Sequence, residues 1–195
     1  RLGQDNTATG FIGGFTGRFV EEGLIAEGIK TNFVHVNQDT RINVKIKADQ
    51  ETEINGTGPV ITKEQVLALE NILQQLSQDD TVVFAGSAPS NLGNQIYERL
   101  IPLVRQTGAQ IVCDFEGQTL LDALDYQPLL VKPNNHELAD LFGVEFNGID
   151  DIVKYGRKLL DMGAQNVLVS MAGDGGLMIT NEGVWRSLAP KGTVI

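Results

Sequence analysis

The chain is poor in cysteine and has no long apolar segment, and each shortage excludes a class of protein. Cys113 is the only cysteine among the 195 residues. No disulfide can therefore form within the chain, which fits a reducing compartment, and we expect a cytoplasmic protein. No apolar run approaches the ~20 residues of a membrane helix, and the N-terminus lacks the pattern of a signal peptide. We therefore expect no membrane partner.

Positive charge is also scarce. The chain has 15 Lys and Arg residues against 25 Asp and Glu, which gives a net charge of -10. Nucleic acid needs a basic face, so this balance argues against it as a partner. A small anionic substrate remains compatible if a few cations converge locally. The sequence also lacks a Walker motif, a nucleophile elbow and zinc-ligand spacing.

What the chain does contain is a hydrophobic fraction of 42%, enough for a core, and a repeated alternation of strand and helix patterns. Short apolar runs of the kind found in strands covered on both faces alternate with helical periodicity. Such units predict a mainly parallel sheet with helices on both faces. The expected strands are 7–12, 32–36, 81–85, 110–113, 129–131, 166–169, 177–180 and 184–187, the last two forming an antiparallel hairpin. The expected helices are 15–26, 62–76, 95–107, 119–124, one ending at 142, and 150–162.

Residues 32–57 break this alternation. In residues 41–47 apolar and polar side chains alternate, which is typical of a half-buried strand with one wet face. Residues 48–51 can turn, and residues 52–55 can return as a hairpin partner. This antiparallel piece is interpreted as a lid, an oligomer contact, or both. We therefore expect a core of residues 1–31 and 58–195 and a lid segment of residues 32–57.

The stretch from Leu129 to Leu138 predicts a strand, a break at Pro133 and a new helix. Asn134 is a good N-cap, and Glu137 stands three residues on, as in a capping box. Lys132 would lie beside the free N–H groups and partial positive charge of that helix, which together make an anion site. An ordinary strand-to-helix turn with a surface lysine explains the same residues, and both interpretations stay open.

Three more turns carry small or polar residues where a strand ends. If the sheet is parallel, all four turns share its carboxyl edge, where ligands bind in open α/β sheets. Glycines there let a backbone approach phosphates. Carboxylates such as Asp114 and Glu137 could hold Mg²⁺ through water. The residues are Gly86 and Ser87, Asp114 with Glu116 and Gly117, and Ser170 with Gly173, Gly175 and Gly176.

For the other candidate residues, each considered alone, the sequence favours a structural role. Arg41 opens the lid strand on its polar side, where a bidentate phosphate contact and a solvated edge charge both fit. The glycine cluster between Gly10 and Gly17 does not match a dinucleotide fingerprint and favours close packing of strand on helix. Cys113 is expected in the core and His136 on a helix surface.

Taken together these runs resemble the PfkB (ribokinase-like) carbohydrate kinases along the whole chain. The specific pieces are Thr40-Arg41-Ile42-Asn43 and Lys132-Pro133-Asn134 with Glu137-Leu138, whereas the glycine pieces alone are common. The resemblance implies a three-layer Rossmann-like α/β fold with a mostly parallel sheet and a small antiparallel β lid. It also implies transfer of phosphate from ATP, with Mg²⁺, to a sugar hydroxyl.

The resemblance further implies roles for single residues. Arg41 would bind the phosphate that the sugar already carries, and Gly86 and Ser87 would also contact the sugar. Glu137 and Asp114 would organise Mg²⁺, and the lid would cover the sugar and pair two copies as a homodimer. The ATP site would include Lys132, Asn134, Ser170, Gly173 and Gly175.

Residues 1–3 read as a helix end and residues 193–195 as a strand start, so we expect a piece of a longer protein. The family's Gly-Gly-Lys-Gly stretch would precede Arg1, and its Gly-Ala-Gly-Asp motif with the catalytic base would follow Ile195. No catalytic residue is therefore expected in this chain, and no turnover by this chain alone. Within the family the lid run favours fructose 1-phosphate, converted to fructose 1,6-bisphosphate, as substrate. The alternatives are tagatose 6-phosphate and a nucleotide-binding module without catalysis.

Overall fold

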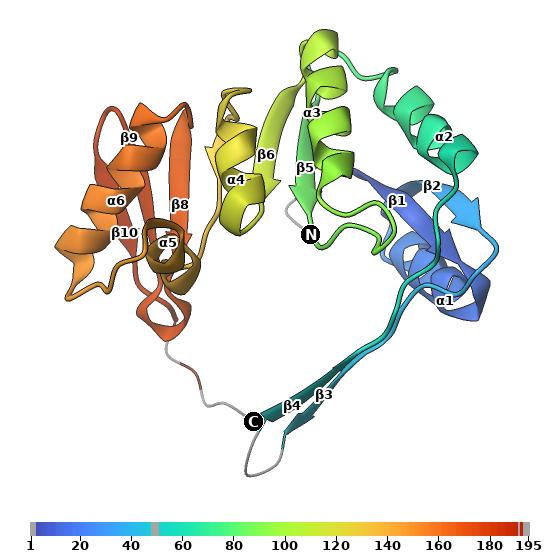
Figure 1. Ribbon diagram of the computed structural model, residues 1–195, viewed down its shortest axis with the longest axis horizontal. Coiled ribbons are helices and arrows are strands. Elements are labelled where there is room, and N and C mark those ends of the chain that lie inside the picture. Colours follow the sequence, from blue (N-terminus) through green and yellow to red (C-terminus); the bar gives the residue numbers. More distant parts are fainter. Residues whose placement is uncertain (1–2, 48–50, 191, 193–195) are drawn as a thin grey trace. The chain divides into compact units, whose positions relative to one another are not determined.

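The fold comes from a computed structural model that describes residues 3–47, 51–190 and 192. The chain forms two compact units, residues 1–75 with 88–96 and residues 76–87 with 97–195. Figure 1 shows the helices and strands of each unit, coloured from the N-terminus to the C-terminus. The features expected at residues 1–2, in the turn at 48–50 and at 193–195 lie outside the described residues.

The first unit begins with a strand, a helix and a second strand. β1 (Thr7–Gly13) pairs in parallel with β2 (Lys30–Val36), and α1 (Gly14–Ala26) connects them. The buried side chains of Ile12, Val34 and Val36 form part of the core of this unit. This arrangement confirms the strand and helix that the apolar pattern predicts at the start of the chain.

The glycines at the β1–α1 junction allow close packing, as expected. A side chain at Gly13 would collide with the carbonyl oxygens of Val36 and Gln38, and one at Gly14 with the Asp39 carboxylate. The same Asp39 carboxylate accepts a hydrogen bond from the Phe15 N–H at 3.0 Å. The N-terminus of α1 therefore already holds a resident anion, which disfavours it as a phosphate site.

The lid segment contains a two-stranded antiparallel hairpin, β3 (Asn43–Lys47) with β4 (Glu51–Asn55). Two expectations about it are wrong. β3 begins at Asn43, so Arg41 precedes the strand instead of opening it. The apolar side, which is expected to be the buried side, is exposed. Its exposed members are Ile42, Val44, Ile46 and Ile54. β2, which falls within the expected lid range, pairs with β1.

The helix expected after residue 62 is α2 (Lys63–Leu73), which ends before Leu76. Its capping box is present. The Gln65 N–H donates to the Thr62 hydroxyl at 3.3 Å, and the Thr62 N–H donates to the Gln65 side chain at 2.8 Å. Two first-turn donors are satisfied in this way, which explains why the helix begins here.

The second unit is built on a six-stranded sheet of order β10-β9-β8-β7-β6-β5. The four strands from β5 to β8 run parallel, and β9 and β10 add an antiparallel hairpin, as the sequence predicts. The strands are β5 (Thr81–Ala85), β6 (Gln110–Asp114), β7 (Leu130–Val131), β8 (Asn166–Ser170), β9 (Gly176–Thr180) and β10 (Val184–Ser187). The helices are α3 (Gln95–Thr107, with its first residues in the first unit), α4 (Gly117–Leu124), α5 (Asn135–Phe142) and α6 (Ile149–Asp161).

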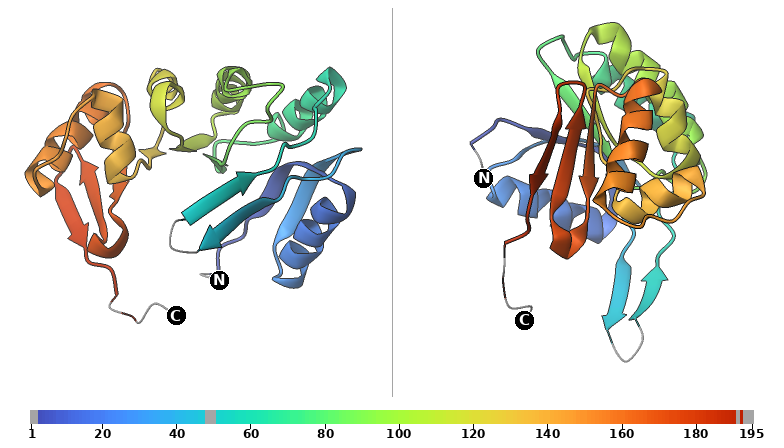
Figure 2. Two further views of the ribbon diagram at one scale, coloured as in Figure 1. Left: turned by 60° about the horizontal axis from the view of Figure 1, so that its bottom comes forward. Right: turned by 90° about the vertical axis from the view of Figure 1, so that its left-hand side faces the viewer.

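Helices α4, α5 and α6 pack on one face of this sheet (Figure 2). Burial along β6, β8 and β9 therefore alternates from residue to residue. Val167, Val169 and Ile179 are fully buried, whereas Val83 in β5 is 61% exposed. The short apolar runs predict burial on both faces. For β5 that expectation is wrong, and the described helices of this unit cover a single face of its sheet.

None of the helices formed by the described residues is both long enough and apolar enough to cross a membrane.

Candidate functional site

Four turns of the second unit lie at the carboxyl edge of its parallel strands. Strands β5, β6, β7 and β8 are neighbours in this order and end at Ala85, Asp114, Val131 and Ser170. The residues that follow, Gly86 and Lys132 among them, therefore lie along one edge, as the sequence predicts. This is the edge at which open α/β sheets bind ligands.

Lys132 and Asp114 form an ion pair at the centre of this edge. The Lys132 ammonium lies 2.9 Å from the nearer Asp114 carboxylate oxygen, and the side chains are 39% and 36% exposed. The strands bring them together, because the Lys132 N–H donates to the Cys113 carbonyl at 3.0 Å. The sequence predicts a phosphate contact for one and a metal contact for the other, and it does not predict their pairing.

The capping box at the start of α5 is present. The Asn134 side chain accepts hydrogen bonds from the His136 and Glu137 N–H groups at 2.8 and 2.9 Å, and the Asn134 N–H donates to Glu137 at 2.8 Å. The anion-site interpretation requires free N–H groups. These two helix N–H groups are instead satisfied within the protein. The helix dipole remains available to an anion beside Lys132.

The ends of β7 and β8 are tied together beyond the strands. Asn134 and Ser170 form an isolated parallel bridge, and the Ser170 N–H donates to the Pro133 carbonyl at 3.1 Å. This contact fixes the loop after β8 against the N-terminus of α5. Two segments that the family resemblance assigns to the ATP site are therefore neighbours.

The loop after β8 is a single 3-10 turn, Ala172–Asp174, closed by a hydrogen bond from the Met171 N–H to the Gly175 carbonyl at 2.8 Å. Gly175 has a positive φ of 92°, and a side chain there would collide with the Ser187 carbonyl, so local packing requires this glycine. A side chain at Gly173 would meet no atom within 4 Å. None of the described packing contacts therefore requires glycine at position 173.

Gly86 follows β5 with a positive φ of 82°, which favours glycine, and its carbonyl accepts a hydrogen bond from the Tyr97 hydroxyl at 3.2 Å. Tyr97 packs against Phe115 with ring centroids 4.3 Å apart, and Phe84 lies beside both. Burial raises the pKa of Tyr97, so the phenol stays protonated and able to donate. Tyr97 is not predicted from the sequence, because no local pattern links it to Gly86.

Arg41 belongs to the first unit, whereas these turns belong to the second. Its backbone follows Thr40, whose carbonyl accepts a hydrogen bond from the Thr16 hydroxyl at 2.6 Å. Its side chain runs close to Gly58, since a Cβ there would lie 3.9 Å from the Arg41 Cδ. The residue is exposed, as a contact with an incoming phosphate requires.

The carboxylates at the carboxyl edge suit a cation that keeps most of its waters better than a cation enclosed by protein ligands. Among residues 3–47, 51–190 and 192, no three His, Cys, Asp or Glu side chains gather closely enough to hold a metal. Asp114 is already paired with Lys132. Glu137 already accepts a hydrogen bond from the Asn134 N–H. Mg²⁺ commonly binds through one or two carboxylates while waters and phosphates supply its other ligands. The residues present fit that mode.

Cys113 and His136 lie where the sequence predicts them. Cys113 is fully buried, and burial raises the pKa of its thiol to about 12. It is therefore a neutral core residue and not a nucleophile. His136 is exposed on α5.

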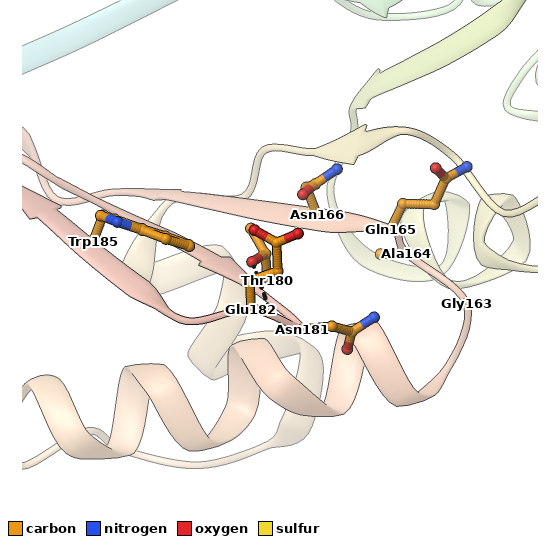
Figure 3. Close-up of a pocket in the computed structure, with 8 residues that line it drawn as sticks. All are labelled: Gly163, Ala164, Gln165, Asn166, Thr180, Asn181, Glu182 and Trp185. Carbon is orange, nitrogen blue, oxygen red and sulfur yellow. Dashed lines mark hydrogen bonds between the residues drawn. The ribbon is translucent and has the colours of Figure 1, made fainter.

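A pocket of about 550 Å³ lies at the opposite, amino edge of the same sheet (Figure 3). It is lined by the start of β8, the β9–β10 turn and the half-exposed ring of Trp185. Its eight lining residues include the carboxylate of Glu182 and no cation. This charge disfavours a phosphate ligand there, and the carboxyl edge remains the candidate site.

A sheet of this order, with its polar turns gathered at one carboxyl edge, defines an α/β protein of the class that binds ligands at that edge. The family model that matches the chain, over residues 1–195, is that of the pfkB family carbohydrate kinases. The chain belongs to this family.

Its relatives are sugar-phosphate kinases by name. It is 46% identical over 188 residues to the 1-phosphofructokinase of Bacillus subtilis, covering 96% of this chain and 62% of the relative. It is 37% identical over 196 residues to the D-tagatose-1-phosphate kinase of Bacillus licheniformis, covering 100% of this chain and 64% of the relative. The chain therefore spans less than two thirds of their length.

The fold is similar to that of phosphofructokinase-2 from Escherichia coli in a crystal structure with substrates and products. The TM-score is 0.90 at 25% identity, covering 98% of this chain and 64% of the other. This likeness confirms the expected α/β fold with its mostly parallel sheet and antiparallel hairpin.

Proposed function

We propose that the protein from which this chain comes transfers a phosphoryl group from ATP to a hydroxyl of a ketohexose 1-phosphate. The observation that carries the proposal is the position of Lys132, at the shared carboxyl edge beside the N-terminus of α5 and the loop after β8. Phosphoryl transfer depends chiefly on positioning and on charge stabilisation, and a fixed cation beside a helix dipole supplies both.

In this proposal Lys132 contacts the nucleotide phosphates, and Asn134 keeps α5 in place beneath them. The loop of Ser170, Gly173 and Gly175 lies alongside the phosphate chain, where the open space at Gly173 admits a ligand. Mg²⁺ bound through Asp114 and Glu137 would neutralise phosphate charge while keeping most of its waters.

The sugar end is assigned to Arg41, with Gly86 and Ser87. The guanidinium of Arg41 matches the phosphate already on the sugar, with two parallel hydrogen bonds. Its placement is supported by the hydrogen bonds of Thr40 to the β1–α1 junction.

Fructose 1-phosphate is the proposed substrate, which the similarity to a 1-phosphofructokinase supports. The second candidate is tagatose 1-phosphate, favoured by the similarity to a D-tagatose-1-phosphate kinase. Tagatose 6-phosphate stays a further candidate.

A turnover assay on the parent protein with ATP tests the proposal. Fructose 1-phosphate, tagatose 1-phosphate, tagatose 6-phosphate and free fructose are compared by kcat/KM. We expect fructose 1-phosphate to be preferred. A preference for an unphosphorylated sugar would contradict the proposal, and nucleotide binding without transfer to any sugar would support the non-catalytic module instead.

The exposed apolar side of the β3–β4 hairpin supports a second copy of the chain as partner. Val44 lies opposite Ile54 in the register, and Ile46 lies on the same side, whereas Lys45 and Glu53 form an ion pair on the other. We expect Val44→Ser with Ile46→Ser to convert a dimer to a monomer in light scattering. Asn43→Ser, on the polar side, is the matched control, and a monomeric parent would refute the assembly.

A further inference from the structure

The ion pair between Lys132 and Asp114 changes what the carboxyl edge offers to an anion. The two charged groups are 2.9 Å apart and only partly exposed. At that separation the carboxylate cancels most of the field of the ammonium at any point more than a few ångströms away. A phosphate approaching Lys132 therefore meets an ion pair, whose attraction at long range is weaker than that of an isolated cation.

Lysine has three donor hydrogens, so Lys132 can in principle keep Asp114 and also contact a phosphate oxygen. The phosphate and the carboxylate would then lie close together as like charges. Their repulsion opposes binding unless a further cation arrives with the phosphate. The geometry thus disfavours a bare polyphosphate and tolerates one that carries its own divalent cation.

We propose that Asp114 determines the specificity of this site. By pairing with Lys132, its carboxylate weakens the binding of polyphosphates that carry no metal ion. The proposal rests on the nucleotide site described under the proposed function and deepens it. Asp114 is thereby given a role in the ligand-free protein, beyond the metal contact implied by family resemblance. The selectivity arises from charges that the chain itself holds.

Glu116 provides a matched control. It lies two residues beyond Asp114, carries the same charge and is exposed, and its side chain makes no capping hydrogen bond to α4. Glu116→Gln therefore removes one negative charge from the same turn without touching the ion pair. Comparing the ATP affinities of this variant and Asp114→Asn separates the effect of the ion pair from that of losing one negative charge.

In the experiment, the unchanged protein and the two variants are each titrated with ATP in a calorimeter, in the presence of EDTA. Asp114→Asn should bind metal-free ATP about three- to fivefold more tightly than the unchanged protein, as expected when a partly exposed ion pair no longer competes. Glu116→Gln should bind as the unchanged protein does. The gain should shrink at high salt. Equal or weaker binding by Asp114→Asn would overturn the proposal.

A double variant tests whether the effect passes through Lys132. In a Lys132→Gln background, Asp114→Asn should give no gain over Lys132→Gln alone. A gain of the same size would show that the carboxylate acts on the ligand directly, and the proposal would fail.

A measurement without nucleotide distinguishes failure of the inference from failure of the proposed function. Acetylation of Lys132, followed by mass spectrometry, should be faster in Asp114→Asn and unchanged in Glu116→Gln, because only the first frees the amine from its partner. Equal rates in all three proteins would overturn the inference. Absence of ATP binding with and without Mg²⁺ would instead refute the proposed function.

Discussion

Thr40 and Gly13 are joined by two hydrogen bonds, from the Thr40 N–H to the Gly13 carbonyl at 2.9 Å and from the Gly13 N–H to the Thr40 hydroxyl at 3.0 Å. These bonds hold the stretch that leads into the β3–β4 hairpin against the β1–α1 junction. The next residue in the chain is Arg41, so its backbone leaves from a fixed point although its side chain is exposed. This anchoring makes Arg41 a suitable residue for testing the sugar end of the proposed site.

We expect Arg41→Ala to weaken binding of fructose 1-phosphate at least about tenfold, because a charge-assisted bidentate contact contributes on the order of 1.5–3 kcal/mol. Binding of ATP should change much less. Calorimetry of both ligands on the parent protein measures the two effects. Arg41→Lys is the control and should recover only part of the loss, since lysine keeps the charge without the fork. Equal losses for both ligands would contradict the assignment.

The two capping boxes give a matched pair of variants. Asn134→Ala and Thr62→Ala should each lower the free energy of unfolding by about 1 kcal/mol, because each removes the acceptor of helix N–H groups. Only Asn134→Ala should also weaken ATP binding, since α5 begins at the candidate site. Denaturant titration and calorimetry give the two readouts. Similar ATP affinities in both variants would place α5 outside the nucleotide site.

Gly173 tests close approach of a ligand to the loop after β8. A methyl group there meets no protein atom within 4 Å, so Gly173→Ala should leave the melting temperature nearly unchanged. We expect it to lower ATP affinity about tenfold or more, because the added carbon would occupy the space of the phosphate chain. Gly148→Ala, which also meets no atom within 4 Å, is the control and should bind ATP normally. Unchanged affinity in Gly173→Ala would argue against contact at this loop.

The buried thiol of Cys113 predicts a loss of stability in alkali. Its pKa is raised from 9.0 to about 12 by burial, so between these values the folded protein keeps a proton that the unfolded chain releases. The contribution is fully present below pH 9, and it falls by about 1.4 kcal/mol per pH unit above that. Denaturant titrations at increasing pH measure the slope.

Cys113→Ala is the comparison and should show a smaller slope. Part of the slope should remain, because burial also raises the pKa of Tyr97. The unchanged protein should react with a thiol reagent at pH 8 only after unfolding. Rapid reaction of the native protein would show that the thiol is accessible.

Most of the local structure follows from local sequence. The capping residues Thr62 and Asn134 fix where α2 and α5 begin, and the period-two pattern of residues 41–47 predicts the β3–β4 hairpin. Such signals involve neighbours in the chain, so they are readable before any folding. The shared carboxyl edge follows as well, because repeated strand–helix units dictate parallel strands.

Burial is harder to read from a single sequence. The apolar run of β5 is compatible with one covered face or two, and Val83 is exposed because the described helices of its unit pack on one side. The hairpin pattern likewise predicts two unlike faces but not what covers the apolar one. Which face is buried depends on neighbours that lie far away in the sequence.

The sequence by itself determined the order of the elements, the helix starts and the gathering of four turns at one edge of a parallel sheet. Only the tertiary structure decided that Lys132 pairs with Asp114, that Tyr97 supports Gly86 and that Asn134 adjoins Ser170. Each of these contacts joins residues at least 11 positions apart, so it depends on how strands and helices pack. Patterns within one element cannot encode such distances.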